Sequence, residues 1–280
     1  MRFINSQDII EKVAAAVIKA NTVLPTDVFK AIANALVYED SLTARNIIEI
    51  ILQNAHIAES EGMAICQDTG LVVVNVCLGQ DVHIVGTSLE TAINEGVRIA
   101  YKAGYFRNSV VNDPILRVNT NDNTPVIINY QLVSGKELSL TISPKGAGSE
   151  NMGQLAMLKP LVGLKGVKDF VLEVVKKASA NPCPPIIVGV GIGGNMEKAV
   201  QLAKGAVLRP INLRNELAYL ADFELELLKA INELGIGPQG LGGRTTALAV
   251  NVEVFATHIA SLPVAVNLSC HATRRVTIRI

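Results

Sequence analysis

The stretch Pro185–Met196, Pro-Ile-Ile-Val-Gly-Val-Gly-Ile-Gly-Gly-Asn-Met, decides the fold class. Its first half, Pro185–Val190, is short and apolar, which is typical of a strand buried on both faces. The glycines that follow predict a tight turn, and Asn195 then begins a helix that runs to Lys204. A buried strand that leads directly into a helix indicates an α/β architecture.

The same glycines offer a second interpretation. Gly189, Gly191 and Gly194 fit the Gly-x-Gly-x-x-Gly pattern of dinucleotide-binding proteins. However, no clear βαβ unit precedes them, and Val-Leu-Arg-Pro at 207–210 stands where an acidic residue for the ribose is expected. We therefore prefer a tight turn that brings the helix N-terminus near some anion.

Outward from this stretch, the sequence predicts a mixed α/β fold, in which a helical N-terminal layer packs on an α/β body with a mixed sheet. The layer covers residues 1–62 and the body covers residues 63–280, within one domain spanning 1–280. Strands are expected over 71–85 with a turn at 79–81, and a hairpin over 125–142 about Ser134-Gly135. Further expected elements are helices at 6–17, 26–36, 43–62, 88–101, 167–178 and 218–234, one starting near 150, and strands at 245–255 and 264–268.

The composition is apolar and neutral. Hydrophobic residues make up 49% of the chain, charged residues only 18%, and the net charge is zero. A neutral chain gives no general electrostatic case for binding nucleic acid or an anionic membrane. No apolar run is long enough for a membrane span, and the start of the sequence does not resemble a signal peptide, since acidic residues interrupt it. The apolar excess favours a permanent protein partner, although a large α/β core is the simpler explanation.

Two further segments are dense in glycine. Residues 144–151, Pro-Lys-Gly-Ala-Gly-Ser-Glu-Asn, contain Gly146 and Gly148, and residues 235–245 read Gly-Ile-Gly-Pro-Gln-Gly-Leu-Gly-Gly-Arg-Thr. Each alone is explained by ordinary turns. Together with the turn after the buried strand, they favour a small-ligand site that is built from loops.

Three of the four cysteines lie at loop edges. Cys66 is in Ile-Cys-Gln-Asp-Thr-Gly, Cys183 is in Asn-Pro-Cys-Pro-Pro, and Cys270 is in Leu-Ser-Cys-His-Ala. Cys77 instead lies within a strand and is expected to be a small core residue. Three loop thiolates with an open fourth position suit an iron–sulfur cluster or a catalytic zinc ion. Because buried free cysteine is common, a purely structural role stays open.

The four histidines give a weaker signal. His56 falls in a helix and His83 in a strand, where structural or exposed positions are expected. His271 follows Cys270 and can support it as an outer neighbour. His258 precedes an apolar strand and has no evident role from its position alone.

Six ordered motifs together resemble the class I, iron–sulfur fumarate hydratases and the related tartrate dehydratases. The similarity is to the alpha subunit of the two-subunit form, and it covers nearly the whole chain as a fumarase-type catalytic domain. The motifs are Cys66–Gly70, Arg107–Pro114, Asn119–Pro125, Lys145–Asn151, Cys183–Gly194 and Cys270–Arg275.

The resemblance implies a four-iron, four-sulfur cluster held by Cys66, Cys183 and Cys270, with Cys77 left out. The fourth iron has no protein thiolate in that family and acts as a Lewis acid on the substrate. Such a site is sensitive to oxygen, which indicates a reducing, cytoplasmic setting.

The resemblance also implies roles for other residues. Asp68 and His258 are the implied catalytic pair, because Asp68 is two residues from a cluster ligand and His258 matches the family's pocket histidine. The implied substrate-binding residues are Gln67, Arg107, Gly146 and Gly148. Of these, Arg107 can grip a carboxylate through two hydrogen bonds.

Two groups needed for hydration are expected outside this chain. Single-chain relatives carry a further C-terminal half with basic residues and a base, so we expect a separate beta subunit and a hetero-oligomer. The first expectation is reversible hydration of fumarate to L-malate. The alternatives are L-tartrate dehydratase or a related hydroxy-dicarboxylate hydro-lyase and, less favoured, a non-catalytic iron–sulfur sensing or assembly module.

Overall fold

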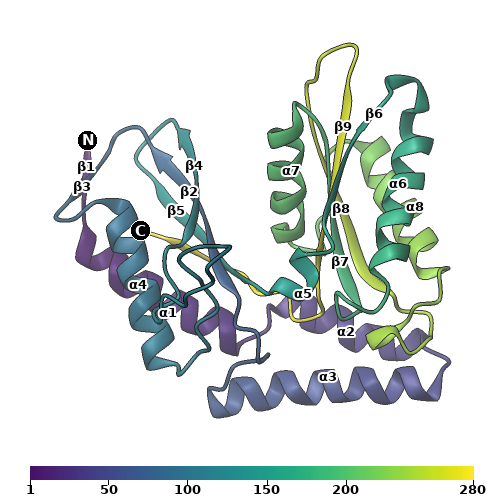
Figure 1. Cartoon of the computed structure of the whole chain (residues 1–280), viewed down its shortest axis with the longest axis horizontal. Coiled ribbons are helices and arrows are strands. Elements are labelled where there is room, and N and C mark those ends of the chain that lie inside the picture. The colour runs from purple at the N-terminus through teal and green to yellow at the C-terminus, as the bar shows by residue number, and fades with distance from the viewer. The chain divides into compact units, whose positions relative to one another are not determined.

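The chain passes back and forth between two structural units in the computed structural model, which describes residues 1–280 (Figure 1). Unit 1 contains residues 1–25, 54–146 and 274–280, and unit 2 contains residues 26–53 and 147–273. The expected division at residue 62 is therefore not the one observed. The N-terminal helices belong to both units instead of forming one layer.

Unit 1 is a two-layer structure. Its four-stranded sheet has the order β10-β5-β2-β4, and a separate pair is formed by β1 and β3. Helices α1 and α4 pack against each other over one face of the sheet. The elements are β1 (Arg2–Asn5), α1 (Ser6–Thr22), β2 (Leu71–Gly79), β3 (Val82–Val85), α4 (Leu89–Ala103), β4 (Ile127–Val133), β5 (Leu138–Lys145) and β10 (Val276–Arg279).

The core of unit 1 follows from alternation along its strands. Val72, Val74 and Val76 of β2 are buried under the helices, whereas the residues between them are half-buried on the opposite face. Fully burying each valine contributes about 1.5–3 kcal/mol. This period of two fixes which face of β2 meets α1 and α4.

The hairpin predicted over 125–142 is wrong. Both strands exist, but β2 lies between them, parallel to β4 and antiparallel to β5. Similarly, the turn at 79–81 does not join a hairpin, because β3 pairs with β1. The valine-rich β2 takes the central position, where it gains partners on both edges, and β4 is left at the edge of the sheet.

Unit 2 has three layers. Its sheet has the order β6-β9-β7-β8, with α7 on one face and α6 and α8 on the other (Figure 1). The elements are α2 (Thr26–Tyr38), α3 (Leu42–Glu61), α5 (Ala147–Glu150), β6 (Gln154–Leu158), η1 (Pro160–Val162), α6 (Gly163–Ala178), β7 (Ile186–Gly193), α7 (Met196–Leu208), α8 (Ala218–Asn232), η2 (Pro238–Gly240), β8 (Ala247–Phe255) and β9 (Leu262–Ser269). Helix α3 extends past residue 53 into unit 1.

The glycines of β7 serve helix packing. All eight residues of β7 are buried. A Cβ atom on Gly189 would lie 2.2 Å from the Ala203 carbonyl oxygen, and one on Gly191 would lie 2.1 Å from the Ala199 carbonyl oxygen. Both carbonyls belong to α7, so these glycines let the helix approach the sheet. Asn195 caps α7, as expected, by accepting a hydrogen bond from the Lys198 backbone N–H at 2.9 Å.

No helix of the structure combines the length and the apolar content that crossing a membrane requires.

Candidate active site

The loop Cys66–Gly70 of unit 1 connects the end of α3 to β2. The Ile65 backbone N–H donates to the Asn21 carbonyl at 2.9 Å, and the Ile65 carbonyl accepts from Asn54 Nδ2 at 2.9 Å. Cys66 is half-buried, and its Sγ lies 3.8 Å from Oε1 of the exposed Gln67. Backbone hydrogen bonds at Ile65 therefore hold the start of this loop, which carries the thiol of Cys66 and the amide of Gln67.

Asp68 has two different surroundings. Its Oδ1 accepts a hydrogen bond from the Gly70 N–H at 2.9 Å, so the carboxylate does cap the turn. Its Oδ2 lies 3.0 Å from the position that a Cβ on Gly146 would occupy. The structure thus places Gly146, a predicted substrate-binding residue, against Asp68, and any side chain there would crowd the carboxylate.

Four buried polar residues, Asn21, Tyr101, Asn123 and Arg274, support this loop, and only Asn123 and Arg274 lie within the motifs that carry the family resemblance. Arg274 is 3% exposed, and its Nη1 donates to the Asp68 carbonyl at 2.9 Å and to Asn21 Oδ1 at 3.1 Å. The Tyr101 hydroxyl donates to the Thr69 carbonyl at 2.7 Å, and Asn123 Nδ2 donates to the Gly70 carbonyl at 3.1 Å. A fully buried Asn or Arg is unusual unless paired, so such residues beside apolar runs are the signal that could have found them.

Tyr101 is almost completely buried. Burial raises the pKa of its phenol to about 12, with smaller opposing effects from the positive charge of Arg274 and from the hydrogen bond to Thr69. The hydroxyl therefore stays protonated and remains a donor to the loop.

Arg107 is tied to the same loop through its backbone. The Arg107 carbonyl accepts a hydrogen bond from Thr69 Oγ1 at 2.7 Å, and Arg107 is exposed. Unit 1 therefore brings together Cys66, Gln67, Asp68, Arg107 and Gly146 through a shared loop and its supports.

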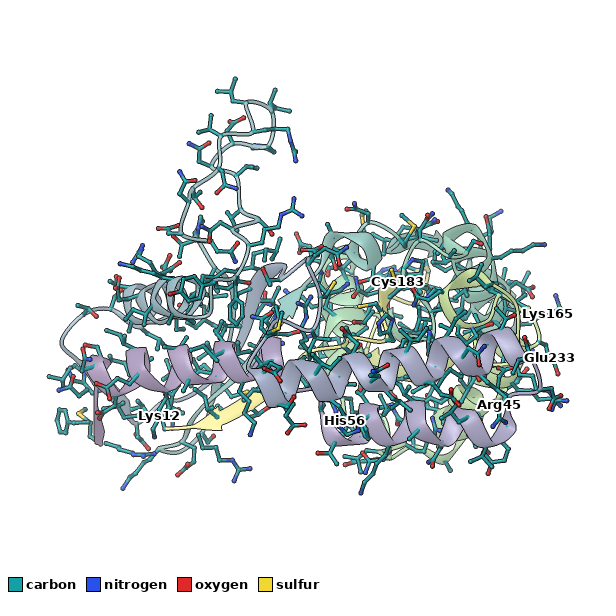
Figure 2. The ribbon with its side chains drawn as sticks, turned by 90° about the horizontal axis from the view of Figure 1, so that it is seen from below. Lys12, Arg45, His56, Lys165, Cys183 and Glu233 are labelled. Atoms are coloured by element: carbon teal, nitrogen blue, oxygen red, sulfur yellow. The ribbon has the colours of Figure 1, made fainter.

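Unit 2 brings Cys183 and Cys270 to one end of its sheet. Cys183, labelled in Figure 2, is exposed, has φ of 55° and lies just before β7. Cys270 is half-buried and directly follows β9. Because β7 and β9 are antiparallel neighbours, the start of one lies beside the end of the other. The two loops are joined directly, since the His271 backbone N–H donates to the Cys183 carbonyl at 3.4 Å.

Gly148 lies at this same end of unit 2. A Cβ atom on Gly148 would be 3.5 Å from the Asn181 carbonyl oxygen, in the loop that carries Cys183. The predicted substrate-binding glycines are thus divided, with Gly146 in unit 1 and Gly148 in unit 2.

His258 is not brought to the cysteine pair. It is exposed in the turn between β8 and β9, where its Nδ1 accepts from the Ala260 N–H at 3.1 Å. The strand register places this turn at the opposite end of the sheet from Cys183 and Cys270, and Figure 1 shows the turn far from α5. The eight residues of β7 span about 25 Å.

Cys77 and the remaining histidines lie elsewhere. Cys77 is in β2 as expected, but it is half-buried on the uncovered face of the sheet, with Sγ 3.6 Å from Gln131 Oε1, so the expectation of a core position is wrong. His56 on α3, labelled in Figure 2, is exposed, and so is His83 on β3.

The donor set is chemically suited to an iron–sulfur cluster, because cysteine thiolates are the ligands such clusters prefer. Cys183 and Cys270 share one sheet end with no disulfide, and Cys66 stands on a loop of unit 1. Neither unit gathers three His, Cys, Asp or Glu side chains into a metal-holding group by itself.

Comparison with known proteins gives a consistent result. Residues 10–279 match the family described as Fumarate hydratase (Fumerase). The putative L(+)-tartrate dehydratase subunit alpha of Methanocaldococcus jannaschii is 42% identical over 263 residues, which cover 92% of this chain and 92% of that protein. The L(+)-tartrate dehydratase subunit alpha of Escherichia coli strain UTI89 is 32% identical over 264 residues, covering 93% of this chain and 86% of that protein. The chain therefore belongs to the class I fumarate hydratase family of hydro-lyases, among its alpha subunits.

Proposed function

We propose that the protein is the alpha subunit of a hydro-lyase that removes water from a hydroxy dicarboxylate, with L-tartrate as the first candidate substrate. The names of its relatives carry this choice, since those named above are L(+)-tartrate dehydratase alpha subunits. Hydration of fumarate, the first expectation from the sequence, is the second candidate, because the family description names it.

We further propose that Cys66, Cys183 and Cys270 hold a four-iron, four-sulfur cluster. The Cys183–Cys270 pair at one sheet end and the presentation of Cys66 on a braced loop support this assignment. When bound, a cluster of this kind supplies an open iron that acts as a Lewis acid on a substrate oxygen.

The chain's own residues supply proton transfer and binding. Asp68 is the proposed group that holds or moves a proton, because its Oδ2 faces Gly146 while Oδ1 is fixed by the Gly70 N–H. Arg107 pairs with a substrate carboxylate, and Gln67 offers an amide beside Cys66. His258 is left out of this assignment, because it lies at the opposite end of the unit 2 sheet from Cys183 and Cys270.

We also propose a separate beta subunit as a permanent partner in a reducing, cytoplasmic setting. The relatives are named as alpha subunits, which implies a further subunit, and a dicarboxylate needs a second cationic group beside Arg107. The beta subunit would supply that group and the second proton-transfer residue.

Anaerobic co-production of this chain with its beta subunit tests the proposal. Reconstituted complex is assayed with L-tartrate, and in both directions with fumarate and L-malate. We expect the highest kcat/KM for L-tartrate; a higher value for fumarate would favour the second candidate. A clustered complex inactive on all three substrates would favour the sensing module.

A further inference from the structure

Gln239 belongs to the third glycine-dense loop, which the proposed function leaves without a role. The residue has φ of 53°, a left-handed backbone conformation that non-glycine residues rarely adopt. A Cβ atom on Gly237 would lie 1.9 Å from the Gly242 carbonyl oxygen, and one on Gly240 would lie 2.3 Å from Ala180 Cβ. The loop is therefore closely folded on itself and lies directly against the chain that leads to Cys183.

The two donors of Gln239 both reach the residue after Cys183. Its backbone N–H donates to the Pro184 carbonyl at 2.8 Å, and its side-chain Nε2 donates to the same oxygen at 2.8 Å. Nε2 also lies 3.2 Å from Nδ1 of His271, the residue after Cys270. One side chain thus contacts both cysteine loops.

The imidazole of His271 is held in either tautomer. Its Nδ1 lies 3.0 Å from the Cys183 carbonyl oxygen and 3.2 Å from Gln239 Nε2. A protonated Nδ1 donates to the carbonyl, and an unprotonated Nδ1 accepts from the amide. The ring therefore keeps a hydrogen bond in both states, either to the Cys183 carbonyl or from the Gln239 amide.

The far end of the loop is fixed by a buried carboxylate. Glu39 is 3% exposed and accepts from the backbone N–H groups of Arg244, at 2.9 Å, and Thr245, at 3.1 Å. The Gly237 N–H donates to Thr246 Oγ1 at 3.1 Å. Gln239 is therefore held by a loop that is anchored on both sides, and all of these contacts lie within unit 2.

We propose that Gln239 is a positioning residue that fixes the Cys183 loop against the Cys270 loop. For the cluster this inference rests on the proposed function, but the ordering of the two loops is a property of the chain itself. Residues that orient metal ligands typically contribute 10–100-fold to metal affinity or activity.

Three variants of the full chain test this role. Gln239→Glu keeps the shape but replaces the donating NH2 by an oxygen that faces the Pro184 carbonyl, and Gln239→Leu removes the side-chain donors without adding charge. Gln201→Glu, on the exposed surface of α7, is the matched charge control. The measurements are the rate of iron release to a chelator after anaerobic reconstitution, the electron paramagnetic resonance spectrum of the cluster, and alkylation rates of each cysteine in the metal-free chain.

We expect both Gln239 variants to release iron about 10-fold faster or more, with an altered resonance spectrum. Alkylation of Cys183 and Cys270 should accelerate several-fold, while Cys66 and Cys77 keep their rates. Gln201→Glu should match the wild type throughout. Iron release and alkylation at wild-type rates in both Gln239 variants would overturn the inference, even if the melting temperature of those variants fell. A wild-type chain that takes up no cluster would refute the proposed function, and the alkylation rates would still decide the role of Gln239.

Discussion

At the scale of single residues, Asp68 combines a turn-capping contact through Oδ1 with a second oxygen, Oδ2, that lies beside Gly146. In Asp68→Asn the amide oxygen still accepts from the Gly70 N–H, whereas the side chain no longer takes up a proton. We expect turnover to fall about 10²–10⁴-fold with little change in cluster content or melting temperature. Asp169→Asn, at an exposed site on α6, serves as the control. Near-normal turnover of Asp68→Asn would mean that capping the turn is its whole function.

The cysteines allow a comparison within one chain. Cys66→Ser, Cys183→Ser and Cys270→Ser should each lose the visible absorbance of the cluster, because thiolate ligation is lost. Cys77→Ser should retain it, since Cys77 lies on the open face of the unit 1 sheet beside Gln131. Equal loss of absorbance in all four variants would contradict this ligand set.

The residues proposed to carry chemistry are easier to find in the sequence than the residues that hold them in place. Cys66 and Asp68 stand in a short motif, so their proximity follows from the chain itself. Arg274 and Gln239 reach their partners across large sequence separations, and nothing local in the sequence indicates those hydrogen bonds. Asp68 does cap a turn, whereas Gly189 and Gly191, expected to form a tight turn, lie within β7 and allow α7 to pack on the sheet.

At the scale of elements, replacing a glycine by alanine should have opposite effects on stability in β7 and in α7. Gly191→Ala would place a Cβ 2.1 Å from the Ala199 carbonyl oxygen, so α7 must move away from the sheet. We expect a loss of about 1–3 kcal/mol in the free energy of unfolding. Gly205→Ala, on the exposed side of α7 with nothing within 4 Å, should instead gain about 0.5–1 kcal/mol. Urea unfolding of both variants checks the pair, and a stable Gly191→Ala would show that the contact is not tight.

The loop 242–245 depends on the charge of Glu39. Burial raises the pKa of this carboxyl, but hydrogen bonds from the N–H groups of Arg244, Ser41 and Thr245 outweigh burial, so its pKa lies below the ordinary value. Because the pKa of Glu39 is lower in the folded state than in the unfolded state, the ionised carboxyl stabilises the fold at pH values above the unfolded-state pKa. This stabilisation is lost as the pH falls through the folded-state pKa.

Glu39→Gln should therefore cost about 1–3 kcal/mol near pH 7. The difference from the wild type should shrink as the pH falls below the ordinary glutamate pKa and through the lower folded-state pKa, because the wild-type carboxylate then becomes protonated. Urea midpoints across this range are the measurement, with Glu49→Gln on the exposed side of α3 as the control. A difference that is independent of pH would show that the shape of Glu39 matters more than its charge.

At the scale of the whole molecule, periodicity predicted most elements but not how they pair. The chain alternates between the two units, so residues adjacent in sequence, such as those on either side of residues 25 or 146, belong to different cores. Strand order is a long-range property: β10, at the end of the chain, pairs with β5, and β2 separates β4 from β5. A pattern of two neighbouring strands and a turn predicts a hairpin, and it cannot show that a third strand takes the central place.

We expect the isolated chain to have little hydro-lyase activity. Large apolar side chains are exposed on edge strand β4, among them Tyr130 at 55% and Leu132 at 70%, and Ile115 and Leu116 beyond α4 are 84% and 77% exposed. Surfaces of this kind are typical of protein interfaces. We expect the beta subunit to bury more than about 2,000 Å² in total with this chain, as obligate complexes do. Turnover should be measured with and without the beta subunit at matched cluster content. Full turnover by the isolated chain would mean that both carboxylate-binding groups and both proton-transfer groups lie within its 280 residues.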